Sequence, residues 1–167
     1  MNPGTDVASL HRALAARVAT VAVAESLTAG LVCAALTEPA GSSVTFRGGL
    51  VVYATDLKHL LAGVPQPLLD RHGPVSAPVA EALAVGVRDR LGATFGLSLT
   101  GVAGPDPLDG VPVGTVYLGL AGPSDAAGQR GAVVRRLELA GSRDSIRTAA
   151  VGAALELLAV GVRESTR

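Results

Sequence analysis

Residues 20–28, with the sequence TVAVAESLT, decide the fold of this chain. The first five are β-branched residues and alanines, which is typical of a buried strand, and we expect the strand to end at Glu25 and Ser26. Ser26 or Thr28 can then cap a helix, because a hydroxyl accepts hydrogen bonds from the free N–H groups of a first turn. A strand that leads directly into a helix is the repeating unit of α/β folds.

Periodicity and turn residues place further elements on both sides of this unit. We expect strands at residues 20–24, 44–53, 94–100, 115–120 and 132–139. Helices are expected at residues 7–18, around 31–35, and at 55–61, 79–91 and 142–162, with a connection at 66–78. Helices and strands alternate at first and two strands follow each other late. The sequence therefore predicts an α/β fold, in which residues 1–167 form a single three-layer α/β/α domain around a mixed sheet.

Composition and charge narrow the classes of function. Hydrophobic residues make up 49% of the chain, and 14 basic residues balance 14 acidic ones without a basic stripe, so no nucleic-acid partner is expected. The single cysteine, Cys33, argues for a reducing compartment, and charges or prolines interrupt the apolar stretches before about 18 residues. We therefore expect a cytoplasmic protein without a membrane partner. The last helix is apolar nearly all round, which predicts either deep burial or a homo-oligomer.

Several common site signatures are missing. The chain has no Gly-x-x-x-x-Gly-Lys phosphate loop and no Gly-x-Ser-x-Gly motif, and its three histidines lack metal-ligand spacing. No metal and no cofactor are therefore expected.

Lys58 is the most unusual charged residue. If Thr55 caps the short helix, Lys58 is at position N3, where the positive end of the helix dipole disfavours a cation. A lysine driven toward its neutral form can act as the general base for a serine. Ser43 lies just before the predicted strand 44–53. Tyr53 is at the far end of that strand, near Lys58. The alternative interpretation is two surface residues and a capping serine.

Two further segments could bind an anion. The loop from Gly101 to Gly104 directly follows a predicted strand, and glycines let backbone N–H groups face a phosphate. Arg143 and Arg147 lie in the first turns of the last helix, which Ser142 would cap. The alternatives are that the loop is an ordinary turn and that the two arginines are solvated at the surface.

Eight segments, in this order, give the chain its family resemblance. They are AESLTAG (24–30), PAGSS (39–43), GGLVVYATDLK (48–58), LLAGVP (60–65), RHGPVS (71–76), LTGVAGP (99–105), PVGTVYLGLA (112–121) and GSRDSIR (141–147). Together they resemble the C-terminal domain of the CinA family, the nicotinamide-nucleotide amidases.

The resemblance implies a serine amidohydrolase that converts nicotinamide mononucleotide, a small nucleotide, to its nicotinate form and ammonia. It implies catalytic roles for Ser43 as nucleophile, Lys58 as base and Tyr53 as assistant. It also implies that the substrate is bound by Glu25, Ser26, Thr28, Thr100, Gly101, Gly104, Arg143 and Arg147, with Arg143 on the phosphate. Ser43 takes the nucleophile role through the resemblance alone, so Ser42 and Ser26 stay open.

Several residues depart from the commoner family motifs: Leu27, Ala29, Ala54 and Thr55, and also Asp106, Pro107 and Leu108 in the loop after Pro105. They leave two alternatives open. One is a non-catalytic nucleotide-binding or oligomeric module, and the other is an amidase for a different small carboxamide.

Overall fold

A computed structural model describes residues 5–123 and 131–165, and a five-stranded mixed sheet lies at its centre. The strand order is β2-β1-β3-β4-β5. The two neighbours of β1, β2 and β3, run parallel to it, whereas β4 is antiparallel to both β3 and β5. The strands are β1 (Val21–Glu25), β2 (Phe46–Val51), β3 (Phe95–Gly101), β4 (Thr115–Ala121) and β5 (Ala132–Glu138).

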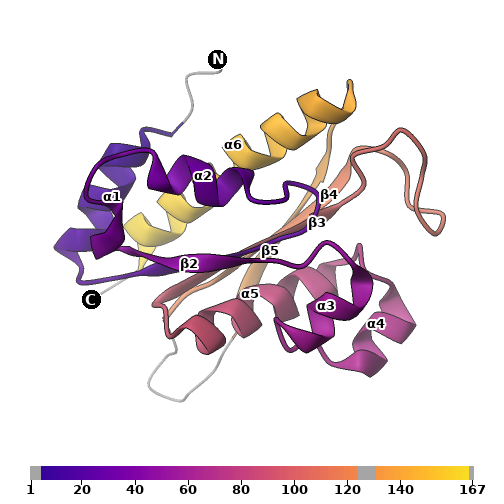
Figure 1. Cartoon of the computed structure of the whole chain (residues 1–167), viewed down its shortest axis with the longest axis horizontal. Helices are drawn as coiled ribbons and strands as arrows, with labels where there is room; N and C mark the ends of the chain where they lie inside the picture. Colours follow the sequence, from indigo (N-terminus) through magenta and orange to yellow (C-terminus); the bar gives the residue numbers. More distant parts are fainter. Residues whose placement is uncertain (1–4, 124–130, 166–167) are drawn as a thin grey trace.

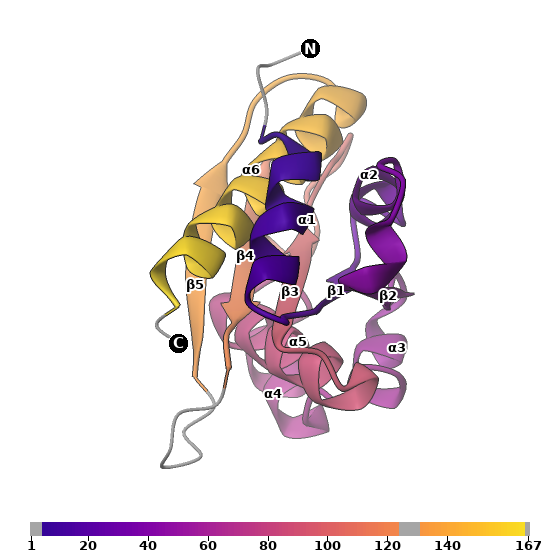
Figure 2. The same cartoon turned by 90° about the vertical axis from the view of Figure 1, so that its left-hand side faces the viewer.

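Helices cover both faces of the sheet, as Figures 1 and 2 show. One face carries α1 (Val7–Ala16), α2 (Leu31–Thr37) and α6 (Arg143–Glu164), and the other carries α3 (Thr55–Leu60), α4 (Gln66–His72) and α5 (Ala77–Leu91). A short 3₁₀ turn, η1 (Ser42–Val44), leads into β2. The three-layer α/β/α architecture predicted from the sequence is confirmed.

Two hydrophobic clusters hold the layers together. Every residue of β1 is buried, because helices cover both faces of the sheet. Its side chains alternate between the two clusters. Val21 and Val23 pack under α1, α2 and α6, and Ala22 and Ala24 pack toward α3 to α5. Helix α5 approaches the sheet closely at Gly96, where a Cβ would lie 2.0 Å from the carbonyl oxygen of Ala84. Any larger residue there would push the helix off the sheet.

The order of the strands creates a crevice. The connection from β1 to β2 passes over one face through α2, whereas the connection from β2 to β3 passes over the other through α3, α4 and α5. In the strand order, β1 is followed by β2 on one side and its neighbour β3 is followed by β4 on the other, so the chain leaves the carboxyl ends of β1 and β3 in opposite directions. Open α/β sheets bind ligands at such a switch point.

Helix α6 is long and apolar enough, by length and composition, to cross a membrane. In this fold it packs on the sheet, where Ile146, Leu155 and Leu158 belong to the larger hydrophobic cluster. Burial in the fold covers 44% of its most apolar stretch. The predicted cap is confirmed, since the Ser142 hydroxyl accepts a hydrogen bond from the N–H of Ser145.

Two sequence predictions about the fold were wrong. Residues 66–72 form α4 instead of an irregular connection, because Pro67 lies in its first turn, where a missing N–H costs nothing. The first helix ends at Ala16, and Val18 follows it in a left-handed conformation with φ of 52° and 92% of its surface exposed. Val18 therefore does not extend the apolar face of α1.

Candidate active site

Glu25, the last residue of β1, organises the turn that leads into α2. Its buried carboxylate accepts hydrogen bonds from the backbone N–H groups of Gly30 (3.0 Å), Val32 (3.1 Å) and Cys33 (2.8 Å). The N-cap position is Gly30, so the predicted capping by Ser26 or Thr28 was wrong. Because Glu25 satisfies the first turn of α2, the Ser26 hydroxyl is left available to the crevice.

Lys58 is almost fully buried beside Ser26. Its side chain is 1% exposed, and Nζ lies 3.1 Å from Oγ of Ser26, 2.8 Å from the carbonyl oxygen of Val52 and 3.5 Å from that of Tyr53. Burial lowers the pKa of Lys58 from 10.5 to about 8, against the opposing effect of the Asp56 carboxylate. The helix begins at Thr55 with Ala54 as its N-cap, so Lys58 is one position later than predicted. Desolvation is the larger cause of the lowered pKa.

The three oxygen neighbours of Nζ suit both forms of the amine, since a charged lysine can donate to all three of them. A neutral lysine has two N–H donors and one lone pair. The two carbonyl oxygens, of Val52 and Tyr53, can take the donors, and the Ser26 hydroxyl can donate to the lone pair. The contact is thus suited to removing a proton from Ser26.

A pocket of about 360 Å³ opens at this contact. That volume lies within the range of small-molecule sites. It is formed at the carboxyl ends of β1, β2 and β3 by residues Ser26, Leu27, Tyr53, Ala54, Thr55, Lys58, Pro74, Val75, Thr100, Gly101, Ala103, Leu108 and Arg143. The structure therefore brings the sequence-predicted residues Ser26, Tyr53, Lys58, Thr100, Gly101 and Arg143 together.

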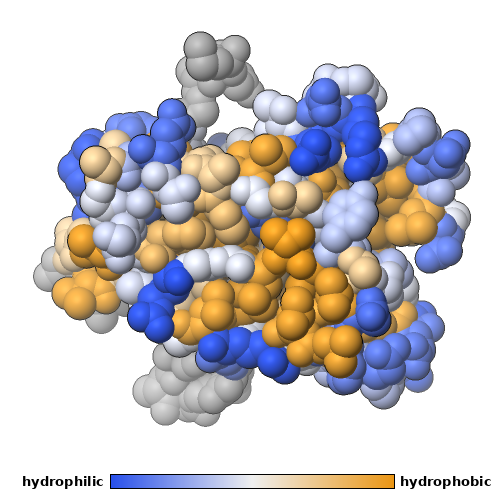
Figure 3. All heavy atoms as spheres, in the orientation of Figure 1, coloured by the Kyte–Doolittle hydropathy of each residue, from blue (hydrophilic) through white to orange (hydrophobic). Residues whose placement is uncertain are grey.

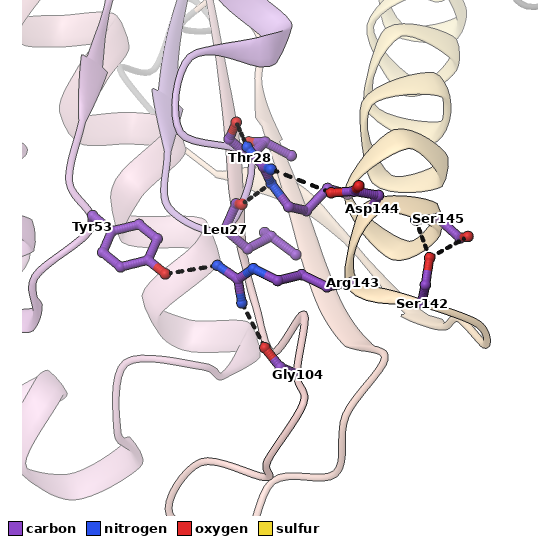
Figure 4. Close-up of polar contacts among 9 residues, drawn as sticks. Leu27, Thr28, Tyr53, Gly104, Ser142, Arg143, Asp144 and Ser145 are labelled. Carbon is purple, nitrogen blue, oxygen red and sulfur yellow. Dashed lines mark hydrogen bonds and ion pairs between the residues drawn. The ribbon is translucent and has the colours of Figure 1, made fainter.

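Arg143 spans the pocket from the first turn of α6 (Figure 4). Its guanidinium donates to the hydroxyl of Tyr53 at 3.0 Å and to the carbonyl oxygen of Gly104 at 2.6 Å. The Tyr53 hydroxyl thus faces Arg143, whereas only its backbone oxygen approaches Lys58. A guanidinium at this place is a candidate site for an anionic group of a substrate.

Arg147, Thr28 and Gly104 support the site from outside the pocket lining. The guanidinium of Arg147 donates to the carbonyl oxygens of Leu27 (3.0 Å) and Thr28 (3.3 Å), and so ties α6 to the turn that carries Ser26. Gly104 contributes its carbonyl oxygen to Arg143. These three contacts position the pocket wall.

Thr100 fixes a second wall of the pocket. Its buried hydroxyl donates to the carbonyl oxygen of Pro74 at 2.7 Å and so holds the segment before α5 against the end of β3. Pro74, Val75 and Leu108 line the pocket but were not among the sequence-predicted residues. Pro74 and Val75 lie in the segment RHGPVS, yet apolar residues in loops carry no chemical signal of a site.

Ser43 lies away from the pocket. It is exposed in η1, before the amino end of β2, whereas Lys58 follows the carboxyl end of the same strand. A strand of six residues separates them, which corresponds to about 16 Å. No hydrogen bond joins Ser43 to Lys58, and Ser26 takes the place beside the lysine that the resemblance assigned to Ser43.

Metal-binding side chains do not gather in the part of the chain that the structure describes. Within residues 5–123 and 131–165, no group of three or more His, Cys, Asp and Glu side chains could hold a metal ion. The Cys33 thiol faces the core, and burial, together with the Glu25 carboxylate, raises its pKa.

The fold and the site define an α/β/α domain with a serine–lysine pair in a crevice at the switch point of its sheet. Comparison with known proteins then gives the family: residues 5–161 match the CinA C-terminal domain, and the chain belongs to this family. A CinA-like protein of Frankia casuarinae is 52% identical over 145 residues, which cover 87% of this chain and 32% of the relative. A putative competence-damage inducible protein of Geobacillus kaustophilus is 49% identical over 128 residues, which cover 77% of this chain and 30% of the relative. The chain thus spans about a third of the length of these curated relatives.

Solved structures of the family share the whole fold. The crystal structure of competence damage-inducible protein A from Klebsiella pneumoniae is similar with a TM-score of 0.88 and 28% identity, over 96% of both chains. That of a competence/damage inducible protein from Agrobacterium tumefaciens has a TM-score of 0.83 and 34% identity, over 98% of this chain and 99% of the other.

Proposed function

We propose that this chain is a cytoplasmic nicotinamide-nucleotide amidase in which Ser26 is the nucleophile and Lys58 the general base. The observation that carries the reaction class is the 3.1 Å contact between Lys58 Nζ and Ser26 Oγ, made by a lysine that is 1% exposed. The choice of nicotinamide mononucleotide rests on the family resemblance of the sequence motifs.

The reaction proceeds as two acyl transfers. Neutral Lys58 takes the hydroxyl proton of Ser26 as Oγ attacks the carboxamide carbon. The carbon–nitrogen bond then breaks, and ammonia leaves with the proton that Lys58 returns. A water molecule, deprotonated in turn by Lys58, attacks the acyl carbon. Cleavage of the ester releases nicotinate mononucleotide and restores the Ser26 hydroxyl.

The negative oxygen that forms during each attack needs donors that are already in place. The N–H of Leu27 directly follows the nucleophile in the turn between β1 and α2, and it has no acceptor among the described residues. The N–H of Ala103, across the pocket, is likewise without an acceptor there. A donor on the residue after the nucleophile is the arrangement used in other strand–turn–helix serine hydrolases.

Arg143 supplies the positive charge for the phosphate of the nucleotide. The guanidinium already faces the pocket and donates to one side chain, Tyr53, and one carbonyl oxygen, Gly104. A phosphate can replace or add to these partners, because arginine has five N–H donors in a planar fork.

The test is ammonia release from nicotinamide mononucleotide by wild type, Ser26→Ala, Lys58→Ala and Ser43→Ala. Ser26→Ala and Lys58→Ala should each lower kcat by at least about 10³-fold, as the loss of a nucleophile or its base does. Ser43→Ala is the matched control and should retain turnover. Loss of activity in Ser43→Ala together with full activity in Ser26→Ala would overturn the assignment.

Two alternatives are separated by the same assay. A folded wild-type chain that releases no ammonia, yet melts at higher temperature with the nucleotide, would be a binding module. Equal rates with nicotinamide mononucleotide and with the riboside that lacks the phosphate would indicate an amidase for another carboxamide. That result would also remove the role given to Arg143.

A further inference from the structure

A second cavity of about 240 Å³, the side compartment, adjoins the candidate active site. Three of the residues that form it, Pro74, Val75 and Leu108, also line the active-site pocket. A side chain that borders two neighbouring cavities separates them. Leu108 on one segment, with Pro74 and Val75 on another, therefore forms the partition between the two cavities.

The Pro74–Val75 half of the partition is fixed in place. The carbonyl oxygen of Pro74 accepts the hydrogen bond of 2.7 Å from the buried hydroxyl of Thr100, and Val75 is itself buried. Withdrawal of this half would break a buried hydrogen bond and expose an apolar side chain. The width of the passage between the two cavities is therefore set by the other half, Leu108.

Leu108 lies at the tip of a hairpin that connects β3 to β4. Its backbone N–H and carbonyl oxygen both pair with Val111, at 3.1 Å and 2.8 Å. The two residues between them, Asp109 and Gly110, have φ of 48° and 78°, as in the tight turn that an Asp-Gly pair favours. The hairpin projects at the right of Figure 1, and Figure 3 shows apolar surface among hydrophilic surface there. A regular turn thus holds the Leu108 side chain at the partition.

The base of the same hairpin adjoins the candidate phosphate site. Arg143 donates at 2.6 Å to the carbonyl oxygen of Gly104, which lies four residues before Leu108. A phosphate bound by Arg143 would therefore lie beside this hairpin. A group attached to the far side of that phosphate would have to pass Leu108 to reach the side compartment.

We propose that Leu108 determines the length of the substrate, because its side chain closes the active-site pocket behind a carboxamide mononucleotide and excludes a dinucleotide. The inference rests on the proposed function, since the position of the phosphate follows from the role given to Arg143. Specificity of this kind comes from an obstacle to the unwanted substrate. Leu108 is also one of the residues at which this chain departs from the commoner family motifs, so the preference is a property of this chain.

The side compartment can hold a nucleoside once the partition is shortened. Pro74 and Val75 offer apolar surface to a base. The carboxylate of Asp109 lines the same cavity and has no partner among the described residues. Carboxylates accept hydrogen bonds from ribose hydroxyls in other nucleotide sites. Shortening Leu108 should therefore allow productive binding of the dinucleotide and not merely widen the pocket.

The test compares ammonia release from nicotinamide mononucleotide and from nicotinamide adenine dinucleotide, which carries the same carboxamide. In the wild type, kcat/KM should favour the mononucleotide at least about 100-fold, and Leu108→Ala should lower this ratio at least about 10-fold by raising the rate with the dinucleotide. Leu60→Ala is the matched control, because Leu60 is also exposed but lines neither cavity, and it should keep the ratio within about 2-fold of wild type.

Two further variants separate the role of the side chain from an effect on folding. Leu108→Met conserves most of the volume and should retain the preference for the mononucleotide. Gly110→Val disfavours φ of 78° in the turn, displaces Leu108 by a second route, and should lower the ratio as Leu108→Ala does. A ratio that stays at the wild-type value in both Leu108→Ala and Gly110→Val, with the mononucleotide still hydrolysed, would overturn the inference and leave the proposed function standing. A wild type that hydrolyses both substrates equally would do the same.

If neither substrate releases ammonia, the proposed function fails, and binding decides the inference instead. In calorimetric titrations, Leu108→Ala should bind the dinucleotide at least about 10-fold more tightly than the wild type does, while its affinity for the mononucleotide stays within about 3-fold. Equal affinities of the two proteins for the dinucleotide would overturn the inference in that case as well.

Discussion

The carboxylate of Glu25 and the backbone N–H of Cys33 are joined by a hydrogen bond of 2.8 Å that links the end of β1 to the first turn of α2. Glu25 makes two more bonds of this kind, so one side chain satisfies most of the free donors of that helix. The neighbouring residue, Ser26, is held by the same turn.

Glu25→Gln should therefore lower the free energy of unfolding by about 1–3 kcal/mol, since hydrogen bonds to a charged acceptor are lost in a buried place. Urea unfolding monitored by circular dichroism measures the change. Glu38→Gln is the control, because Glu38 is exposed at the end of α2. Equal stabilities of the two variants would contradict the capping role.

Val18→Gly should raise the stability by about 1 kcal/mol. Val18 adopts φ of 52° directly after α1, a left-handed conformation that is costly for a β-branched residue and free of strain for glycine. Val44→Gly is the comparison: Val44 is also exposed, but its φ is not positive, so glycine there should be neutral or destabilising. Thermal melts of the two variants should shift in opposite directions or differ by several degrees.

The rate of hydrolysis should depend on the protonation of Lys58. Because its pKa is about 8, kcat/KM should rise with pH and level off above that value. Asp56→Asn removes the charge that raises the pKa of Lys58, so the midpoint should move to lower pH. Asp70→Asn, on the exposed surface of α4, should leave the midpoint in place. A midpoint unaffected by Asp56→Asn would argue against Lys58 as the titrating group.

Lys58→Met should abolish turnover and stabilise the fold by about 1–3 kcal/mol at pH 7, since a buried amine is replaced by an apolar chain of similar length. The pKa of Lys58 is lowered from 10.5 to about 8 by folding, so the unfolded chain binds more protons between these values. The stability of the wild type should rise over this pH range. The advantage of Lys58→Met in urea unfolding should accordingly shrink from pH 7 to pH 10, and an advantage that grows would contradict the burial argument.

Arg143→Ala should raise KM for nicotinamide mononucleotide by at least about 10-fold while kcat falls less, as expected when binding of a remote charged group is lost. Arg143→Lys keeps the charge but loses the fork, and should recover part of the affinity. The riboside without a phosphate should show no difference between Arg143→Ala and wild type. A large loss with the riboside as well would mean that Arg143 acts on the fold or on the reacting group.

The sequence predicted the sheet and its layers because hydrophobic periodicity is a local property. The family resemblance assigned Glu25, Tyr53, Lys58 and Thr100 to one site. The structure places all four near the carboxyl ends of strands, and parallel strands bring such ends together. The family motif alone pointed to Ser43. The structure instead places Ser26 at Lys58. Ser26 follows the carboxyl end of β1, whereas Ser43 precedes the amino end of β2.

The residue that caps α2 could not be predicted from the sequence, for a related reason. A Ser or Thr near a helix start is a short-range signal, whereas Glu25 reaches the N–H of Cys33 from eight positions away. Burial of Lys58 was also hidden, because it results from the packing of α3 against the end of β2. Long-range contacts of polar side chains therefore set the chemistry of this site.

The carboxylate of Glu25 ties the catalytic pair to the durability of one helix end. It holds the first turn of α2, and the next residue along the chain is Ser26, whose hydroxyl contacts Lys58. Local opening of that turn would therefore also separate the serine from the lysine.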